Sequence, residues 1–309
     1  MIYETLIKDV DISMNKNEFD QIIKENLEVT KGEKAFGYMV FENPKVYNVY
    51  YNKHEFEVFK EEMKSLYPDA YQAFFDGKGS ELKEHIGRYG FMPPKMASVA
   101  SSSRFCYLAL RNGAKALGGT GSVIFEHECR IADLGIYCNA PQLDAYIKNE
   151  NIFIEVKCHE IFDVHSIILK NKYWNLIYGE NNQFGFQPLH NSDKNSFDIP
   201  LSVFGLQKKY SMFDIKQLIC HLLGIASQSG TSKKLVYLFF IPKSDNVEKQ
   251  KALEEVFINL QQETLSIFNS NPITNFCSIN NIELCAVVQR AKTMEELTLK
   301  NMRVIYPKV

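Results

Sequence analysis

The chain has 309 residues, of which 45% are hydrophobic and 23% charged, and its formal net charge is −2. This length allows one large domain or a core with one or two additions, and the composition is that of a soluble globular protein. No apolar run approaches the length of a membrane span, and the start of the chain lacks the basic and apolar segments of a signal peptide. We therefore expect a cytoplasmic protein with no membrane partner.

The isoelectric point near 6.4 counts mildly against nucleic-acid binding, because such binding depends on neutralising phosphates. The objection is limited. Affinity depends on local basic patches, and a carboxylate metal site adds acidic residues to a nuclease. The sequence has no Lys- or Arg-rich tail, repeat or low-complexity segment. Overall charge thus leaves nucleic acid open as a partner.

The cysteines predict reduced thiols rather than a disulfide framework, since none of them has CxxC spacing. The nearest approach to a soft-metal cluster is formed by His127, Cys129, Cys158 and His159. Their spacing matches no usual zinc site, so we do not expect zinc there.

The first part of the chain is rich in aromatic residues and alternates in the manner of β-strands around residues 36–41 and 46–51. Helical spacing fits residues 18–26 and 55–66, with Pro68 ending the second helix. We expect residues 1–76 to form an N-terminal α+β extension packed on the core. Its aromatic side chains are expected to form a small core rather than a surface that stacks on bases.

Two glycines, Gly77 and Gly79, precede Ser80 and Glu81. The pattern lacks the length and the terminal Lys-Ser/Thr of a phosphate-binding P-loop, so it predicts a turn with Ser80 capping a helix from Glu81.

A second helix is predicted to open within residues 98–103 and to be closed by Gly118 and Gly119. The apolar stretch 123–128, which contains Glu126, follows it.

Residues 141–147 and 151–158 read as two strands on either side of a polar break, because both are apolar and lack an internal Gly or Pro. Alternation places Glu155 and Lys157 on the face opposite three aliphatic residues, where a surface ion pair is the plain interpretation. Asp144 weakens that interpretation, because a hairpin brings it near Glu155. Two close carboxylates repel each other unless a cation such as Mg²⁺ lies between them.

Downstream, residues 214–224 form an amphipathic helix with Gln217 and His221 one turn apart on one face. A buried strand (235–241), a long helix (247–268) and a second apolar strand (282–288) follow, and a helix (294–300) and a strand (304–306) end the chain. The strand-helix-strand order predicts an α/β sheet with helices on its faces.

Asp144, ten further residues and then Glu155-Val156-Lys157 resemble the active-site signature of the PD-(D/E)xK nuclease superfamily. Pro141 stands three residues before Asp144 rather than next to it, but it is not the chemical group. The order of motifs over residues 77–162 is similar to a branch of bacterial restriction-endonuclease-like proteins. The resemblance implies a restriction-endonuclease-like core over residues 77–309, with a mixed central sheet flanked by helices.

The resemblance also implies that a set of polar residues converges. Asp144, Glu155 and Lys157 carry over directly, and Glu126 and Glu81 are added to them. Glu160 fits either the site or the acidic start of a helix. The Gln217-x-x-x-His221 spacing is similar to the Gln-x-x-x-Tyr helix of some nucleases in the superfamily, and it fits an exposed polar pair on a core helix equally well.

Under this interpretation, Asp144, Glu155 and the Val156 carbonyl hold Mg²⁺, for which Mn²⁺ can substitute, and Lys157 orients the attacking water and stabilises negative charge. The expected enzyme is a metal-dependent nuclease acting on DNA in restriction or defence. The sequence is also compatible with an RNA substrate, with single- or double-stranded nucleic acid, and with a homodimer.

Two other classes stay open. A catalytically inactive protein with the nuclease fold would bind nucleic acid or a protein partner. A different hydrolase would use His127, His159 or His165 with a cysteine, although lone His and Cys residues are usually structural.

Overall fold

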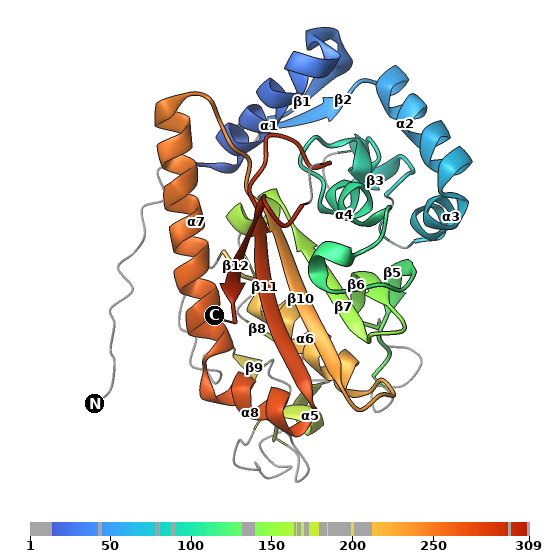
Figure 1. The fold of residues 1–309 in the computed structure, drawn as a ribbon. Helices are drawn as coiled ribbons and strands as arrows, with labels where there is room; N and C mark the ends of the chain where they lie inside the picture. The colour runs from blue at the N-terminus through green and yellow to red at the C-terminus, as the bar shows by residue number, and fades with distance from the viewer. Residues whose placement is uncertain are drawn as a thin grey trace.

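The protein is an α/β structure built on a mixed six-stranded sheet with helices on its faces (Figure 1). The computed structural model describes residues 14–42, 45–77, 79, 81–87, 90–131, 140–163, 165, 168–169, 173–178, 184, 199–200, 212–295 and 298–307. Its helices are α1 (Lys16–Lys31), α2 (Lys53–Leu66), α3 (Pro68–Asp76), α4 (Ser102–Leu110), α5 (Trp174–Tyr178), α6 (Ile215–Ala226), α7 (Val247–Phe268) and α8 (Asn271–Ile279).

The central sheet has the strand order β12-β11-β10-β7-β6-β5. Its strands are β5 (Val123–Glu128), β6 (Gln142–Ile147), β7 (Ile152–Lys157), β10 (Lys233–Phe240), β11 (Ile282–Gln289) and β12 (Met302–Tyr306). The β5-β6-β7 meander is antiparallel, β7, β10 and β11 run parallel, and β12 is antiparallel to β11. Parallel strands require crossover connections, and α7 with α8 supplies the one between β10 and β11.

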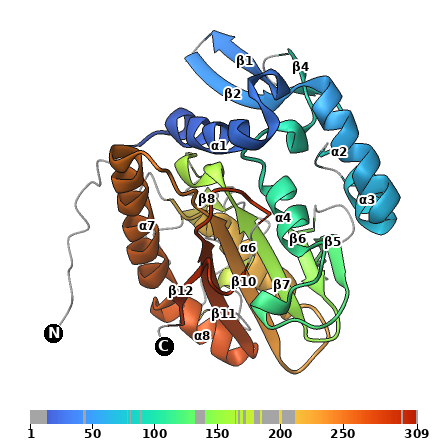
Figure 2. The ribbon, with the colours of Figure 1, turned by 45° about the horizontal axis from the view of Figure 1, so that its top comes forward.

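Helices cover both faces of the central strands (Figures 1 and 2). Tyr237 and Phe240 of β10 point to opposite faces, because they are three residues apart. The Tyr237 hydroxyl contacts His221 of α6, whereas the Phe240 ring packs on Phe105 of α4 with ring centroids 5.2 Å apart. The sheet is therefore buried on both sides, and β10 is apolar along most of its length for that reason.

The N-terminal part consists of α1, the hairpin β1 (Phe36–Glu42) and β2 (Lys45–Tyr51), and the helices α2 and α3. Helix α1 packs against the short 3-10 helix η5 (His159–Phe162), which directly follows β7. Phe19 and Phe162 meet edge to face there, with ring centroids 5.2 Å apart. The boundary expected at residue 76 stays a prediction, and the buried side chains on both sides of it belong to one hydrophobic cluster.

The strongly patterned elements lie close to their predicted positions. Helix α7 spans the predicted residues, and β6, β7, β10 and β11 match within two residues at each end. Several short elements were missed, namely α3, α5, α8, β3 (His85–Gly87), β4 (Gly90–Met92), β8 (Ile168–Leu169) and β9 (Ile199–Pro200).

Three local predictions were wrong. No helix starts at Glu81, where the chain bends and then enters β3; Ser80 lies outside the described residues. Helix α4 ends at Leu110, and Gly118 instead ends the 3-10 helix η3 (Lys115–Leu117) in a left-handed conformation with φ 85°. The predicted helix at 294–300 is absent from its described residues, which form turns.

Among the described residues, no helix is both long and apolar enough to cross a membrane. The described cysteines form no disulfide, and Cys138 lies outside the described residues.

Helix α6 approaches the start of β6 at a glycine. A Cβ on Gly224 would lie 2.8 Å from the Cys129 carbonyl oxygen and 3.2 Å from Cγ of Pro141. Any larger residue in this position must push the helix away from the strand. The close approach matters because α6 carries Gln217 and His221.

We expect Gly224→Ala to destabilise the protein by about 1–3 kcal/mol through overpacking, although alanine has a helix propensity about 1 kcal/mol better than glycine. Urea unfolding measures the change. Ser266→Ala on the exposed face of α7 is the control, and its effect should stay within about 0.5 kcal/mol. A gain in stability for Gly224→Ala would contradict the close packing of α6.

Candidate active site

Three carboxylates occupy corresponding positions on three neighbouring strands. In the β5–β6 ladder, Phe125 faces Ala145 and His127 faces Leu143, so Glu126 stands opposite Asp144. In the β6–β7 ladder the last pair is Ala145 with Ile154, and the next residues along are Asp144 and Glu155. Side chains opposite each other in an antiparallel ladder share a face, and like charges there are destabilising. The sheet thus places three acidic side chains next to one another, and their repulsion destabilises the folded state.

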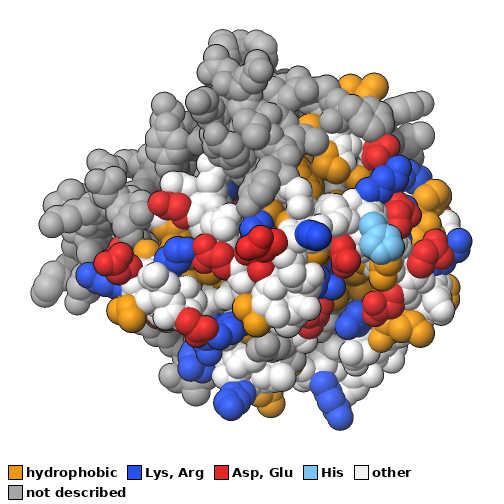
Figure 3. Space-filling model, turned by 90° about the horizontal axis from the view of Figure 1, so that it is seen from above, with side chains coloured by type: hydrophobic (Ala, Val, Ile, Leu, Met, Phe, Trp, Pro, Cys, Tyr) orange, Lys and Arg blue, Asp and Glu red, His pale blue; other side chains and the backbone are white. Residues whose placement is uncertain are grey.

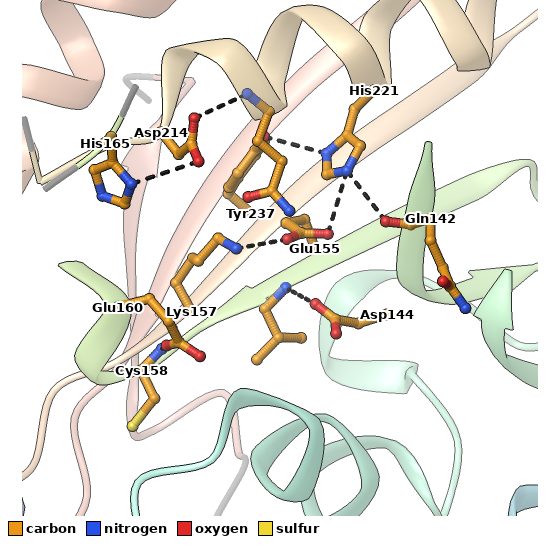
Figure 4. A network of polar contacts seen from close by, with 12 residues as sticks. Gln142, Asp144, Glu155, Lys157, Cys158, Glu160, His165, Asp214, His221 and Tyr237 are labelled. Carbon is orange, nitrogen blue, oxygen red and sulfur yellow. Dashed lines mark hydrogen bonds and ion pairs between the residues drawn. The ribbon is translucent and has the colours of Figure 1, made fainter. Parts of the chain in front are cut away.

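Asp144 and Glu155 are held by different contacts (Figure 4). Asp144 Oδ2 accepts a hydrogen bond of 2.7 Å from the Val156 backbone N–H, across the opening of the hairpin. Glu155 Oε1 accepts one of 2.7 Å from Lys157 Nζ. Glu155 is only 3% exposed, so the plain interpretation of a surface ion pair, which Asp144 had already weakened, does not hold. A buried pair of this kind is a specific structure rather than an incidental surface contact.

Glu126 adopts a backbone conformation that non-glycine residues rarely take, with φ 56°. The break it makes in the β5–β6 ladder turns its carboxylate toward Gln142, whose Nε2 donates a hydrogen bond of 2.8 Å to Glu126 Oε2. A Cβ on Gly77 would lie 3.1 Å from the same Oε2, so a glycine at the end of α3 leaves room for this carboxylate. Strained backbone of this type is concentrated at functional sites.

Glu81 is the second acid that packs against a glycine. A Cβ on Gly79 would lie 2.2 Å from Glu81 Oε1, which excludes any other residue there without a shift. Lys95 Nζ lies 3.6 Å from the same oxygen. Glu81 Oε2 is buried and, within the part of the chain that the structure describes, has no hydrogen-bond partner. A buried carboxylate oxygen without a donor is costly, and a bound cation would relieve that cost.

Of the predicted site residues, Glu81, Glu126, Asp144, Glu155 and Lys157 line one cavity of about 500 Å³, whereas Val156 is fully buried and is not among its lining residues. Its acidic wall contains Glu81, Glu126, Asp144, Glu155 and Glu160. Hydrogen-bond donors and cations line most of the rest, namely Lys16, Tyr50, His85, Lys95, Ser98, Ser101, Ser102, Ser103, Gln142, Lys157, His159 and Gln217. The cavity therefore joins residues from the N-terminal part, the start of α4, the β5-β6-β7 meander and α6.

The electrostatics of the cavity reflect crowding of acids. Burial, followed by the charge of Glu155, raises the pKa of Asp144 well above its usual value. Burial and then the charge of Glu81 raise the pKa of Glu126 to about 7. Burial also raises the pKa of Glu81, against the effect of Lys95. Carboxylates whose protons are retained for these reasons are ready to exchange them for a metal cation.

The pKa of Lys157 is also raised, but for a lysine a raised pKa favours the charged form. Burial by itself lowers the pKa of Lys157, but the nearby Glu155, Glu160 and Asp144 carboxylates outweigh it, so the pKa lies above the ordinary lysine value. Lys157 is therefore an ammonium group at neutral pH. It is suited to stabilising negative charge and unsuited to accepting a proton from water.

Glu160 lines the cavity and is also the acidic residue in the first turn of η5, so both interpretations of it apply. Its Oε2 accepts a hydrogen bond of 2.8 Å from the Cys158 N–H, and the Ser102 hydroxyl also bonds to its carboxylate. Burial raises the pKa of Glu160, but His159, Lys157 and these hydrogen bonds together lower it. Glu160 thus ties the segment after β7 to the first turn of α4.

Helix α6 covers the site from one side. Asp214 caps it by accepting a hydrogen bond of 2.9 Å from the Gln217 N–H, and His165 Nδ1 lies 3.4 Å from the other Asp214 oxygen. Gln217 lines the cavity, and His221 is 2% exposed beneath it. The two residues are not an exposed polar pair, so the surface interpretation of this helix was wrong. Burial lowers the pKa of His221, so the imidazole is neutral at neutral pH.

The histidine–cysteine alternative gains no support from the geometry. His127 stacks on Tyr146 with ring centroids 4.3 Å apart, and His159 Nδ1 lies 2.8 Å from the fully buried Asp20 of α1. Burial and the nearby Glu160 raise the pKa of Cys158 well above its usual value, which keeps this thiol protonated. A protonated, buried thiol is a poor nucleophile.

Sequence reasoning missed several residues of the cavity. Gln142, Lys95 and Lys16 were not singled out, although Gln142 holds Glu126 and Lys95 pairs with Glu81. Gln142 stands two residues before Asp144, and the period of two along a strand was the signal for it. Lys16 comes from α1, and no local pattern connects it to β7.

The donor chemistry of the cavity fits a hard divalent cation. Carboxylate oxygens are the ligands that Mg²⁺ and Mn²⁺ prefer, and the orphaned Glu81 oxygen is of this type. Over the described ranges, no group of three or more His, Cys, Asp and Glu side chains is arranged to hold a metal ion.

Comparisons with protein-family models, with curated proteins and with solved structures give no match for this chain.

The raised pKa of Glu126 predicts a pH-dependent penalty. The unfolded carboxyl loses its proton near pH 4.5, whereas the folded one keeps it up to about pH 7, so the folded state binds more protons between these values and its stability falls as the pH rises. Glu126→Gln removes this titration. In a buffer with chelator, its free energy of unfolding should exceed that of the wild type by up to about 3 kcal/mol above pH 7, and by little near pH 4.5.

Urea unfolding at the two pH values provides the measurement. Glu61→Gln on the exposed face of α2 controls for the general loss of a carboxyl group. A Glu126→Gln effect that does not change with pH would show that burial and the neighbouring acids do not raise the pKa of Glu126.

Proposed function

We propose that the protein is a metal-dependent nuclease of the PD-(D/E)xK type, with a restriction-endonuclease-like core and DNA as the expected substrate. The observation that carries this proposal is the row of Glu126, Asp144 and Glu155, which share one cavity with the Lys157 ammonium group. Two or more carboxylates beside a lysine can hold a metal ion and stabilise negative charge during an attack of water on a phosphodiester.

Asp144 and Glu155, with the Val156 carbonyl, are the proposed ligands of Mg²⁺ or Mn²⁺. Glu126 and Glu81 face the same cavity and are proposed to complete its acidic wall. A cation bound there supplies Lewis-acid activation of the phosphate and of the attacking water. The protein's own part is to hold the carboxylates together against their repulsion, which costs free energy when no cation is present.

Lys157 is proposed to act by charge. Its raised pKa keeps it protonated, so it stabilises the negative charge that develops on the phosphate oxygens and orients the attacking water by hydrogen bonding. Glu155 Oε1, at 2.7 Å, fixes the ammonium group within the cavity. This assignment gives Lys157 an electrostatic role and leaves proton removal to another group or to solvent.

The substrate is expected to be bound by donors near the cavity rather than by a broad basic surface. The face in Figure 3 shows Lys and Arg side chains mixed with Asp and Glu over its described part. Lys16, Lys95 and the serines at the start of α4 are the local donors. Phosphate contacts from such groups position a nucleic acid without reading its sequence.

A second candidate is a catalytically inactive protein of the same fold. The observation that favours it is that Glu155 Oε1 already has a cationic partner, Lys157 Nζ at 2.7 Å. A carboxylate engaged in this way can serve as a structural ion pair. The two candidates differ in whether the cavity takes up a divalent ion.

We expect Lys157→Ala and Asp144→Ala each to lower Mg²⁺- or Mn²⁺-dependent cleavage by at least about 100-fold, because each removes a group that acts on the transition state. Plasmid, single-stranded DNA and RNA are the substrates, each with and without EDTA. Lys292→Ala removes a lysine from a surface pair with Asp245 and should retain full activity. Full activity in either site variant would refute the assignment.

Metal uptake separates the two candidates. Calorimetry should show Mn²⁺ binding to the wild type and weaker binding to Glu155→Gln, since the amide has no charge to offer the cation. Binding that is unchanged in Glu155→Gln would place the ion elsewhere. A wild type that binds no Mn²⁺ and cleaves no substrate would favour the inactive candidate.

A further inference from the structure

The contacts of His221 connect α6 to the carboxylate of Glu155. His221 Nε2 lies 3.2 Å from the Gln142 carbonyl oxygen and 3.7 Å from Glu155 Oε2. On the other side of the ring, Nδ1 lies 3.4 Å from the Tyr237 hydroxyl. Figure 4 shows the imidazole of His221 with dashed contacts to Tyr237, Gln142 and Glu155.

These neighbours determine which ring nitrogen carries the proton. A carbonyl and a carboxylate oxygen both accept hydrogen bonds, so the nitrogen facing them must be the donor. His221 therefore has its proton on Nε2. Its Nδ1 is left as an acceptor, and the Tyr237 hydroxyl donates to it.

We propose that His221 is a positioning residue that orients the Glu155 carboxylate, and that Tyr237 fixes the histidine in the tautomer this role requires. The proposal deepens the proposed function and rests on it, because it assigns His221 to the orientation of a residue of the nuclease site. Neither His221 nor Tyr237 lines the cavity, so both act through Glu155.

The two oxygens of Glu155 have different neighbours. Lys157 Nζ donates to Oε1 at 2.7 Å, whereas His221 Nε2, which donates to the Gln142 carbonyl at 3.2 Å, lies 3.7 Å from Oε2. With only Lys157, the carboxylate can rotate about its last side-chain bond. The N–H dipole of His221 favours the orientation in which Oε2 faces it. Partners of this kind orient the groups that act on a metal or substrate, and losing them typically costs about 10–100-fold in metal affinity or activity.

The surroundings make this orientation rigid. Tyr237 stands next to Glu155 in the parallel β7–β10 ladder, and its ring packs on Phe213 with centroids 4.6 Å apart. Gln142 belongs to β6, and its side chain holds Glu126. His221 thereby contacts residues of three adjacent strands, and the close approach of α6 at Gly224 keeps the ring there.

The first test reads the tautomer directly and needs no nuclease activity. In the full chain labelled with ¹⁵N-histidine, the His221 signals are those lost in His221→Gln. We expect a protonated Nε2 and an unprotonated Nδ1 near neutral pH, with shifts in Glu155→Gln and Tyr237→Phe. Tyr107→Phe is the matched control, since Tyr107 is also 1% exposed but lies on α4, and it should leave these signals unchanged. A proton on Nδ1, or no response to Glu155→Gln, would overturn the proposal.

The second test uses Mn²⁺-dependent cleavage of plasmid DNA. His221→Leu should lower the cleavage rate about 10–100-fold, and His221→Gln should restore most of it, because the glutamine amide places a donor where Nε2 lies. Tyr237→Phe should lower the rate in the wild-type background and have no effect in His221→Leu, which a merely structural tyrosine would not show. Equal loss in His221→Leu and His221→Gln, with unfolding midpoints like that of the wild type, would count against the positioning role. If the wild type neither binds Mn²⁺ nor cleaves, the proposed function fails, while the tautomer measurement still decides how His221 contacts Glu155.

Discussion

The register of the β5-β6-β7 meander holds Glu126, Asp144 and Glu155 close together. Backbone hydrogen bonding sets this register, and the apolar faces of the strands fix it, because a slip by one residue would expose Leu143, Ala145 and Ile147. The repulsion between the acids is therefore imposed by the fold. Burial and then this repulsion raise the pKa values of Asp144 and Glu126, and the charge of Lys157 offsets part of the effect at Asp144.

Three distant segments close the cavity around this row. Helix α6 packs over it through Gly224 and His221, the start of α4 bonds to Glu160 through Ser102, and α1 reaches it through Asp20 and His159. A second link joins α1 to the segment after β7, since Lys16 Nζ lies 2.6 Å from an Asp163 oxygen. The N-terminal part thus contributes a wall of the cavity, so its contacts belong to the architecture of the site.

Long periodic segments were predictable from the sequence because one physical cause dominates each of them. Apolar residues with a 3.6-residue period predicted α7, and continuous runs of apolar, β-branched and aromatic residues predicted β10 and β11. The same alternation placed Glu155 and Lys157 on one face of β7. It suggested that this face is exposed to solvent, because strand alternation does not show that α6 packs over it. The prediction of a helix at Glu81 was wrong for a related reason. Ser80 and Glu81 have the form of a capping sequence, but tertiary contacts bury the Glu81 carboxylate against Gly79 and Lys95. The pairing of Asp20 with His159 joins residues 139 positions apart and leaves no local signal.

The central claim is that the carboxylates of the meander hold a divalent cation. The most direct measurement is the anomalous scattering of Mn²⁺ in a crystal of the protein. The account predicts a peak in the cavity with oxygens of Asp144 and Glu155 within about 2.0–2.6 Å of it. A crystal that binds Mn²⁺ only outside the cavity, in a protein that still cleaves nucleic acid with Mn²⁺, would contradict it.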